Sequence, residues 1–186
     1  MTPESTAKQR LVDHLSERAV RTDGPFTLRS GAVSDWYIDA RQTTFDGSGA
    51  IAVGEAVLDV LDPSITAVGG LTMGADPIAI ATAIAAARAG RSLRAFSVRK
   101  EEKDHGVGGR LVGPVGSNDT VAVLEDTTTT GSAMFEAIDA LADAGIAVAQ
   151  VVVLVDRSGD LASAKVAERG IEYVSLVTPK DLGVEE

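Results

Sequence analysis

Residues 121–138 read VAVLEDTTTTGSAMFEAI, and this stretch decides the fold. Its four small apolar residues, 121–124, predict a buried strand, and the apolar spacing after Gly131 predicts a helix that ends at Gly145. Two adjacent carboxylates, Glu125 and Asp126, and four threonines stand between them. The chain therefore passes from a strand through acidic and hydroxyl groups into a helix, an arrangement that suits a ligand site.

The rest of the chain repeats this alternation of strand and helix. Apolar strands are predicted at 64–70, 93–99, 120–126, 146–157 and 171–176, and helices at 51–61, 74–90, 131–145 and 159–170. Strands that are apolar throughout and alternate with helices indicate a parallel sheet covered on both faces. The sequence predicts a single α/β domain over 1–186, with a core over about 46–186.

The first 45 residues form a separate pattern. Thr2, Pro3 and Glu4 are expected to open a helix that carries Leu11 and Leu15 at helical spacing. Two short β-prone runs around residues 30–31 then predict a hairpin. We expect this helix and hairpin to form a small N-terminal appendage, called the hood below.

The composition limits the kinds of partner. The chain has 45% hydrophobic and 24% charged residues, as an ordinary soluble globular protein has, and it contains no cysteine to form disulfides or bind metal. Its net charge of −10 argues against nucleic acids and anionic membranes, which need a cationic face. The longest uncharged apolar run, 77–87, is too short to span a bilayer, and residues 1–10 lack the apolar core of a signal peptide. We expect a cytoplasmic protein.

The junction at 125–132 has the features of a phosphoribosyl site. Ligands of open parallel sheets bind beyond the carboxyl ends of the strands, where Glu125 and Asp126 are expected. Backbone N–H groups at a helix start, together with threonine and serine hydroxyls, cradle a phosphate. The carboxylates would repel that phosphate, so they need sugar hydroxyls or Mg²⁺ as partners. The alternative is a plain strand and a helix capped by a threonine, which leaves most of the run unexplained.

Other phosphate and nucleophile motifs are absent. The chain contains no GxxxxGK[ST], no GxGxxG after a strand and no GxSxG. It has two histidines, of which His14 is expected on the solvent side of the first helix and is assigned no role.

The predicted loop at 100–119 concentrates cations and glycines. Five cations and three acids lie between Arg94 and Arg110, which is a local charge of +2, and Lys100 and Lys103 are two of the chain's five lysines. Such a run is commonly a solvated surface. A long loop in a compact domain is usually functional or disordered, however, and its glycines suit a mobile lid.

These motifs together resemble a known family. Residues 121–133, VAVLEDTTTTGSA, resemble the phosphoribosyl pyrophosphate (PRPP) motif of the type I phosphoribosyltransferases. Residues 99–106, RKEEKDHG, resemble the RKxxKxHG lid of its orotate phosphoribosyltransferase branch, and residues 26–39 resemble that branch's hood. The similarity covers nearly the whole chain in order. It implies transfer of the 5-phosphoribosyl group from PRPP to orotate, giving orotidine 5′-monophosphate and pyrophosphate in pyrimidine biosynthesis.

The resemblance also implies roles by position. The lid would hold the pyrophosphate of PRPP and reach the site of a neighbouring subunit, which implies a homodimer. Mg²⁺ would be bound mainly through PRPP, near Glu125 and Asp126, with no direct side-chain ligand required. Catalysis would depend on Lys103, His105 and Asp126. PRPP contacts would come from Arg99, Lys100, Lys103, His105, Glu125, Asp126, Thr127, Thr128, Thr129, Thr130, Gly131, Ser132 and Ala133, and orotate contacts from Thr129, Arg157, Tyr37 and Ile38, with Arg29 as a further candidate.

Two departures and several alternatives accompany this interpretation. Met73 stands where many relatives carry a lysine, and Thr127 and Thr128 stand where apolar residues are usual. Arg157 could instead pair with Asp156 or Asp160 at the surface. Another PRPP-dependent base transferase, a non-catalytic PRPP-binding regulator and a purely structural α/β domain are the alternative functions.

Overall fold

The computed structural model describes residues 6–27, 33–102 and 109–184. The hood elements are α1 (Ala7–Arg18), β1 (Val20–Arg21), β2 (Phe26–Thr27), β3 (Val33–Ser34), β4 (Tyr37–Ile38) and α2 (Arg41–Thr44). The core elements are α3 (Gly47–Val60), β5 (Ala67–Leu71), α4 (Ala75–Arg88), β6 (Arg94–Val98), β7 (Leu111–Val112), β8 (Thr120–Thr128), α5 (Ser132–Asp143), β9 (Ala147–Asp156), α6 (Leu161–Ala167), β10 (Glu172–Val177) and the 3₁₀ helix η1 (Pro179–Leu182).

A central six-stranded sheet has the order β10-β9-β8-β5-β6-β7. Its pairings are parallel except for that of β6 with β7, so the predicted α/β class is confirmed. The chain leaves β5 towards β6 on one side and returns to β8 on the other. The ends of β5 and β8 therefore form a topological switch point, where open α/β sheets bind ligands.

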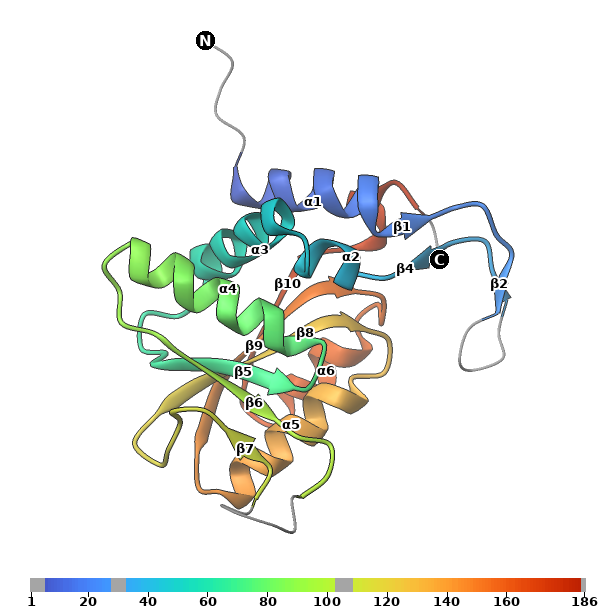
Figure 1. The fold of residues 1–186 in the computed structure, drawn as a ribbon. Coiled ribbons are helices and arrows are strands. Elements are labelled where there is room, and N and C mark those ends of the chain that lie inside the picture. The colour runs from blue at the N-terminus through green and yellow to red at the C-terminus, as the bar shows by residue number, and fades with distance from the viewer. Residues whose placement is uncertain (1–5, 28–32, 103–108, 185–186) are drawn as a thin grey trace.

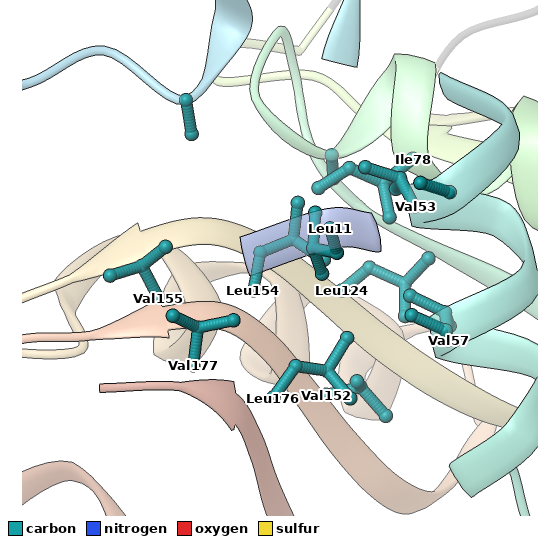
Figure 2. Packing of buried hydrophobic residues seen from close by; sticks show 14 of the residues in the cluster. Leu11, Val53, Val57, Ile78, Leu124, Val152, Leu154, Val155, Leu176 and Val177 are labelled. Atoms are coloured by element: carbon teal, nitrogen blue, oxygen red, sulfur yellow. The ribbon is translucent and has the colours of Figure 1, made fainter. Parts of the chain in front are cut away.

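Helices cover both faces of this sheet (Figure 1). Alternate side chains of β8 enter different cores: Leu124 packs with α1, α3 and α4, whereas Val123 packs with α5 and α6. Figure 2 shows the first core, in which Leu11, Val53 and Ile78 meet Leu124 and Leu154 of the sheet. Each fully buried Leu, Val or Ile contributes about 1.5–3 kcal/mol. This burial on two faces explains why the strands are apolar throughout.

The hood contains the predicted hairpin, built from two short antiparallel ladders. β2 pairs with β3, and β1 pairs with β4. Helix α1 begins at Ala7, because Thr6 is extended and its side chain accepts a hydrogen bond from the N–H of Gln9. Thr2, Pro3 and Glu4, which were expected to open a helix, lie outside the described residues. In Figure 1 α1 lies along α3, and both contribute to the first core.

His14 corrects a second expectation. Its side chain is only 16% exposed, so it does not lie on the solvent side of α1. Its Nδ1 lies 3.1 Å from Thr43 Oγ1 and its Nε2 lies 3.1 Å from Asp46 Oδ1. The histidine thus joins α1 to α2 and to the N-cap residue of α3, a contact that helical spacing alone does not reveal.

Two core elements also differ from their predicted form. The predicted loop at 100–119 contains β7, whose Leu111 and Val112 pair with the end of β6. Strand β8 continues beyond the predicted end at Asp126 to Thr128, because its pairing with β9 continues to Thr128 and Asp156. Within the described residues, no helix is long and apolar enough to cross a membrane.

Candidate active site

A cavity of about 630 Å³ lies at the switch point between β5 and β8. The loop after β5, the last part of β8, the start of α5 and the segment after β6 surround it. Five residues that the sequence predicted as PRPP contacts line it together: Lys100, Glu125, Asp126, Ser132 and Ala133. The fold therefore brings the acidic pair, the helix start and a lid lysine to one place.

The acidic pair lies within β8, where the sequence predicted it as the last two residues of a strand that ends at Asp126. Glu125 is only 7% exposed, and burial together with the neighbouring Asp126 charge raises the pKa of Glu125 to about 8. The Asp126 carboxylate accepts a hydrogen bond from the N–H of Thr127, with 2.7 Å between Oδ1 and N. At neutral pH Glu125 therefore keeps its proton far more readily than an exposed glutamate does.

The loop after β5 approaches Asp126 closely. A Cβ atom added to Gly74 would lie 3.0 Å from that carboxylate, which is tighter than ordinary packing allows. The neighbouring Met73 is 57% exposed, lines the cavity and is joined to Thr72 by a cis peptide bond. Met73 thus brings an apolar side chain to the position where the resemblance expected a cation.

The turn into α5 leaves the helix start open. Gly131 is the N-cap residue of α5, and no side chain caps the helix, so a capping threonine does not account for the threonine run. Gly131 has φ +80°, and a Cβ there would lie 2.6 Å from Met134 Cε. The hydroxyls of Thr130 and Ser132 lie 2.9 Å apart beside this turn. Orphan N–H groups and two hydroxyls therefore face the same region, as a phosphate cradle requires.

The threonine run divides between strand and turn. Thr127 and Thr128 belong to β8, whereas Thr129 and Thr130 follow it and are exposed. The side chain of Thr128 is buried, and its carbonyl accepts the N–H of Arg157 at 2.8 Å. The two threonines that replace apolar residues thus help to build the strand beneath the cradle.

The cations between Arg94 and Arg110 have different partners. Arg94 pairs with Asp119, and Arg110 pairs with Glu136 of α5. Arg110 also donates to the carbonyl of Arg99 at 2.7 Å, while the Arg99 guanidinium donates to the Gly109 carbonyl at 3.4 Å. These bonds close the base of the lid as a hairpin, and exposed Lys100 lines the cavity beside it. Lys103, His105 and Arg29 lie outside the described residues.

The predicted base-side residues join the hood to the core. The Arg157 guanidinium carbon lies 3.9 Å from the centroid of the Trp36 ring. The sequence did not predict this contact. Tyr37 is 37% exposed, and its ring centroid lies 5.8 Å from that of Phe26. Ile38 is buried in the first core, so any contact with a base would use its main chain.

Sequence reasoning missed several residues of this region. Arg41 lines the cavity and pairs with Asp39 at 2.7 Å, and the hydrogen bond to Asp39, followed by the charges of Asp39 and Asp126, raises the pKa of Arg41. Glu136 lines the cavity and anchors Arg110. Arg41 lies inside the predicted hood, two residues after the stretch 26–39 that carries the resemblance, which was a usable signal. Nothing in the sequence pattern distinguishes Glu136 from the other acidic residues of the helix.

The described residues include no cluster of three or more His, Cys, Asp or Glu side chains that could hold a metal ion. The cavity nevertheless offers paired carboxylate oxygens, the donors that Mg²⁺ prefers. Mg²⁺ therefore fits here if most of its ligands come from a bound phosphorylated molecule and water.

Comparisons with known proteins agree with this arrangement. No protein-family profile matches the chain. Orotate phosphoribosyltransferase of Streptomyces avermitilis is 42% identical over 176 residues, which are 94% of this chain and 96% of that relative. The solved Mycobacterium tuberculosis H37Rv orotate phosphoribosyltransferase superposes with a TM-score of 0.84 at 32% identity, covering 96% of this chain and 99% of that one.

A second structure of the M. tuberculosis enzyme, in complex with PRPP, superposes with a TM-score of 0.78 at 30% identity, covering 96% of this chain and 99% of that one. The sequence relative and the two structures each match at least 94% of this chain. This chain therefore belongs to the orotate phosphoribosyltransferase family.

Proposed function

We propose that the protein transfers the 5-phosphoribosyl group of PRPP to orotate, producing orotidine 5′-monophosphate and pyrophosphate. The observation that supports this most directly is the cavity at the switch point. It combines an uncapped helix start, an acidic pair and a lysine from the lid base. Family membership supports the same reaction. Because PRPP carries several charges and does not cross a bilayer unaided, we propose a cytoplasmic location.

The cradle would hold the 5-phosphate of PRPP. In this proposal the backbone N–H groups of 129–133 and the hydroxyls of Thr130 and Ser132 donate to the phosphate oxygens. Micromolar affinity needs about 8 kcal/mol, whereas a helix dipole supplies about 0.3–1 and a charged hydrogen bond about 1.5–3 kcal/mol. The cradle alone is therefore insufficient, and the lid cations must contribute.

The acidic pair would hold the ribose. Asp126 would accept hydrogen bonds from ribose hydroxyls, and the protonated form of Glu125 could donate one. A Mg²⁺ ion bound through PRPP would lie near the same two residues and would neutralise charge on the pyrophosphate. Held in this way, the anomeric carbon is fixed between the leaving group and the base.

The lid would stabilise the leaving pyrophosphate. The transition state of this transfer resembles an oxocarbenium ion, with negative charge increasing on the pyrophosphate. Fixed cations at that place lower the barrier, and a closed lid excludes the water that would hydrolyse PRPP. Lys100 lies at the cavity, and the resemblance assigns the same task to Arg99, Lys103 and His105.

The base would bind between the core and the hood. A guanidinium can hold the orotate carboxylate through two hydrogen bonds, which is the role proposed for Arg157. Thr129, Tyr37 and the main chain of Ile38 would complete this side, with Arg29 as a further contact. Uracil lacks the carboxylate, so a site built on an arginine should reject it.

The deciding experiment measures pyrophosphate release from PRPP and Mg²⁺ with orotate, uracil, adenine or hypoxanthine supplied separately. Release with orotate alone is expected. Release with another base would retain the PRPP cradle and refute the proposed base site. Bound PRPP with no release for any base would instead support the non-catalytic regulator.

We also propose a homodimer in which each lid serves the partner's site. Ile51, Ile80 and Ile84 on α3 and α4 are 50–55% exposed, and Ile51 and Ile84 border a groove of about 490 Å³. This groove also holds Arg88 with Glu55 and Asp59, and a self-complementary mixture of apolar and opposite charges suits a two-fold interface. Analytical ultracentrifugation should show that the wild-type protein is a dimer and that Ile84→Glu is a monomer.

Mixing two inactive variants tests the shared lid. Lys103→Ala removes a lid cation, and Asp126→Asn alters the ribose site. If the lid acts on the partner, each mixed dimer has one site with both groups intact, so random mixing restores up to about a quarter of wild-type activity. No recovery, with mixed dimers confirmed by mass, would show that the lid acts within its own subunit.

A further inference from the structure

Trp36 holds the arginine that is proposed to bind the base. It lies between β3 and β4 in the hood, whereas Arg157 follows β9 in the core. The 3.9 Å separation between the Arg157 guanidinium carbon and the Trp36 ring centroid is well within the range of a cation–π contact. Trp36 is only 4% exposed, so this contact is shielded from water.

The main chain on both sides of this contact is held in place. The N–H of Arg157 donates to the Thr128 carbonyl at the end of β8, at 2.8 Å. Next to it, the Asp156 carboxylate accepts from the N–H of Ser158 and from the Tyr173 hydroxyl, each at 2.7 Å. Asp156 is therefore engaged by β10 and by its own turn, so the main chain that carries Arg157 is anchored beside the Trp36 ring.

The hood side is held as well. The Ser34 hydroxyl donates to the Trp36 carbonyl at 2.8 Å and accepts from the Trp36 N–H at 3.4 Å. The tryptophan also belongs to the first hydrophobic core, which includes residues of α1 and α3. The ring is thus a fixed surface, and the arginine side chain rests on it.

We propose that Trp36 is a positioning residue for base recognition, because its ring fixes the plane of the Arg157 guanidinium so that its donors point towards the base. This inference rests on the proposed function. A long arginine side chain otherwise loses considerable rotamer entropy when it binds a carboxylate, and stacking removes much of that freedom beforehand. The hood is thereby linked to the affinity for orotate as well as to the shape of the site.

A second consequence follows from the composition. Trp36 is the only tryptophan of the chain. Since its ring contacts the guanidinium that would receive the orotate carboxylate, its fluorescence should change when orotate binds. Inorganic phosphate, which should occupy the cradle only, should change it much less.

The test compares Trp36→Leu with Trp36→Phe. Leucine retains apolar volume but has no aromatic face, so we expect the KM for orotate to rise roughly 3- to 30-fold while the KM for PRPP stays within about 2-fold. Phenylalanine restores a face and should recover most of the loss. A destabilised hood variant, Leu15→Ala, is the control, because it removes a buried side chain of α1 without touching this contact.

The outcomes separate this inference from the proposed function. An inactive wild-type protein would refute the function itself. An active wild type whose KM for orotate is unchanged in Trp36→Leu, or is raised equally in Leu15→Ala, would overturn the positioning role alone. If Trp36→Leu does not fold, the wild-type titration decides: after correction for orotate absorbance, an unchanged Trp36 emission at saturating orotate refutes the proposal.

Discussion

Replacing Glu125 with glutamine should stabilise the protein increasingly as the pH rises. The Glu125 carboxyl is 7% exposed, and burial with the adjacent Asp126 charge raises its pKa from 4.5 to about 8. In the unfolded chain it loses its proton near pH 4.5, whereas the folded protein keeps this proton until about pH 8. Folding therefore becomes less favourable between these two values, and the contribution of Glu125 to stability is lost as the pH rises through them.

The size of this effect follows from the displacement of the pKa. At about 1.4 kcal/mol per unit, the loss approaches about 3 kcal/mol at pH 7 and about 5 kcal/mol above pH 9. Glutamine has nearly the same shape and cannot ionise, so it escapes this loss. Since whole domains are stable by only about 5–15 kcal/mol, the difference is easily measured.

The assay is urea unfolding of the wild type and Glu125→Gln at pH 5, 7 and 9 without Mg²⁺. The variant should gain stability relative to the wild type at each step. Glu168→Gln, on the exposed surface after α6, removes the same charge without a buried site and serves as the control. If the free energies of unfolding of Glu125→Gln and wild type differ by the same amount at pH 5 and at pH 9, the reasoning is refuted.

Four further substitutions test the site. Lys100→Ala should lower kcat roughly 10- to 100-fold with an unchanged unfolding midpoint, and an unchanged rate would remove Lys100 from the lid's task. Gly131→Ala should lower the free energy of unfolding by about 1–3 kcal/mol, because φ is +80° at this position and the side chain of Met134 leaves no room for a Cβ atom. The same change should raise the KM for PRPP, and a wild-type unfolding midpoint and KM would contradict the prediction. Arg157→Ala should raise the KM for orotate roughly 10- to 100-fold but not that for PRPP, and equal effects on both would refute its assignment. Met73→Lys adds a cation to the cavity and should lower the KM for PRPP roughly 3- to 10-fold at low salt, a gain that must fade at high salt if it is electrostatic.

Much of the fold could be read from the sequence because its signals are local. The apolar runs, the helical spacing and the glycines at helix ends each act within a few residues, and they predicted α3, α4, α5 and the parallel strands near their observed positions. The turn proposed as the phosphate cradle was also local, since strand, turn and helix start are continuous in 121–138. The hood was recognisable from its motif, whereas the lid stays a prediction, because residues 103–108 lie outside the described part of the chain.

Other features required contacts between distant segments. β8 continues to Thr128 because β9 pairs with it that far, so the acidic pair lies inside a strand. The position of Met73 against the cavity likewise depends on the return of the chain from β6 to β8. Hydrogen bonding between strands overrides the turn preference that polar residues show in sequence.

The charges show the same division between sequence and tertiary structure. The sequence alone determined that cations gather between Arg94 and Arg110, but pairing with Asp119 and Glu136 neutralises the first and last of them. The raised pKa of Glu125 and the contact of Arg157 with Trp36 also arise only when separate elements enclose these groups. Residue types and local backbone preferences are properties of the chain, whereas burial and pairing depend on which surfaces folding brings together, so only the tertiary structure decided what each charge does.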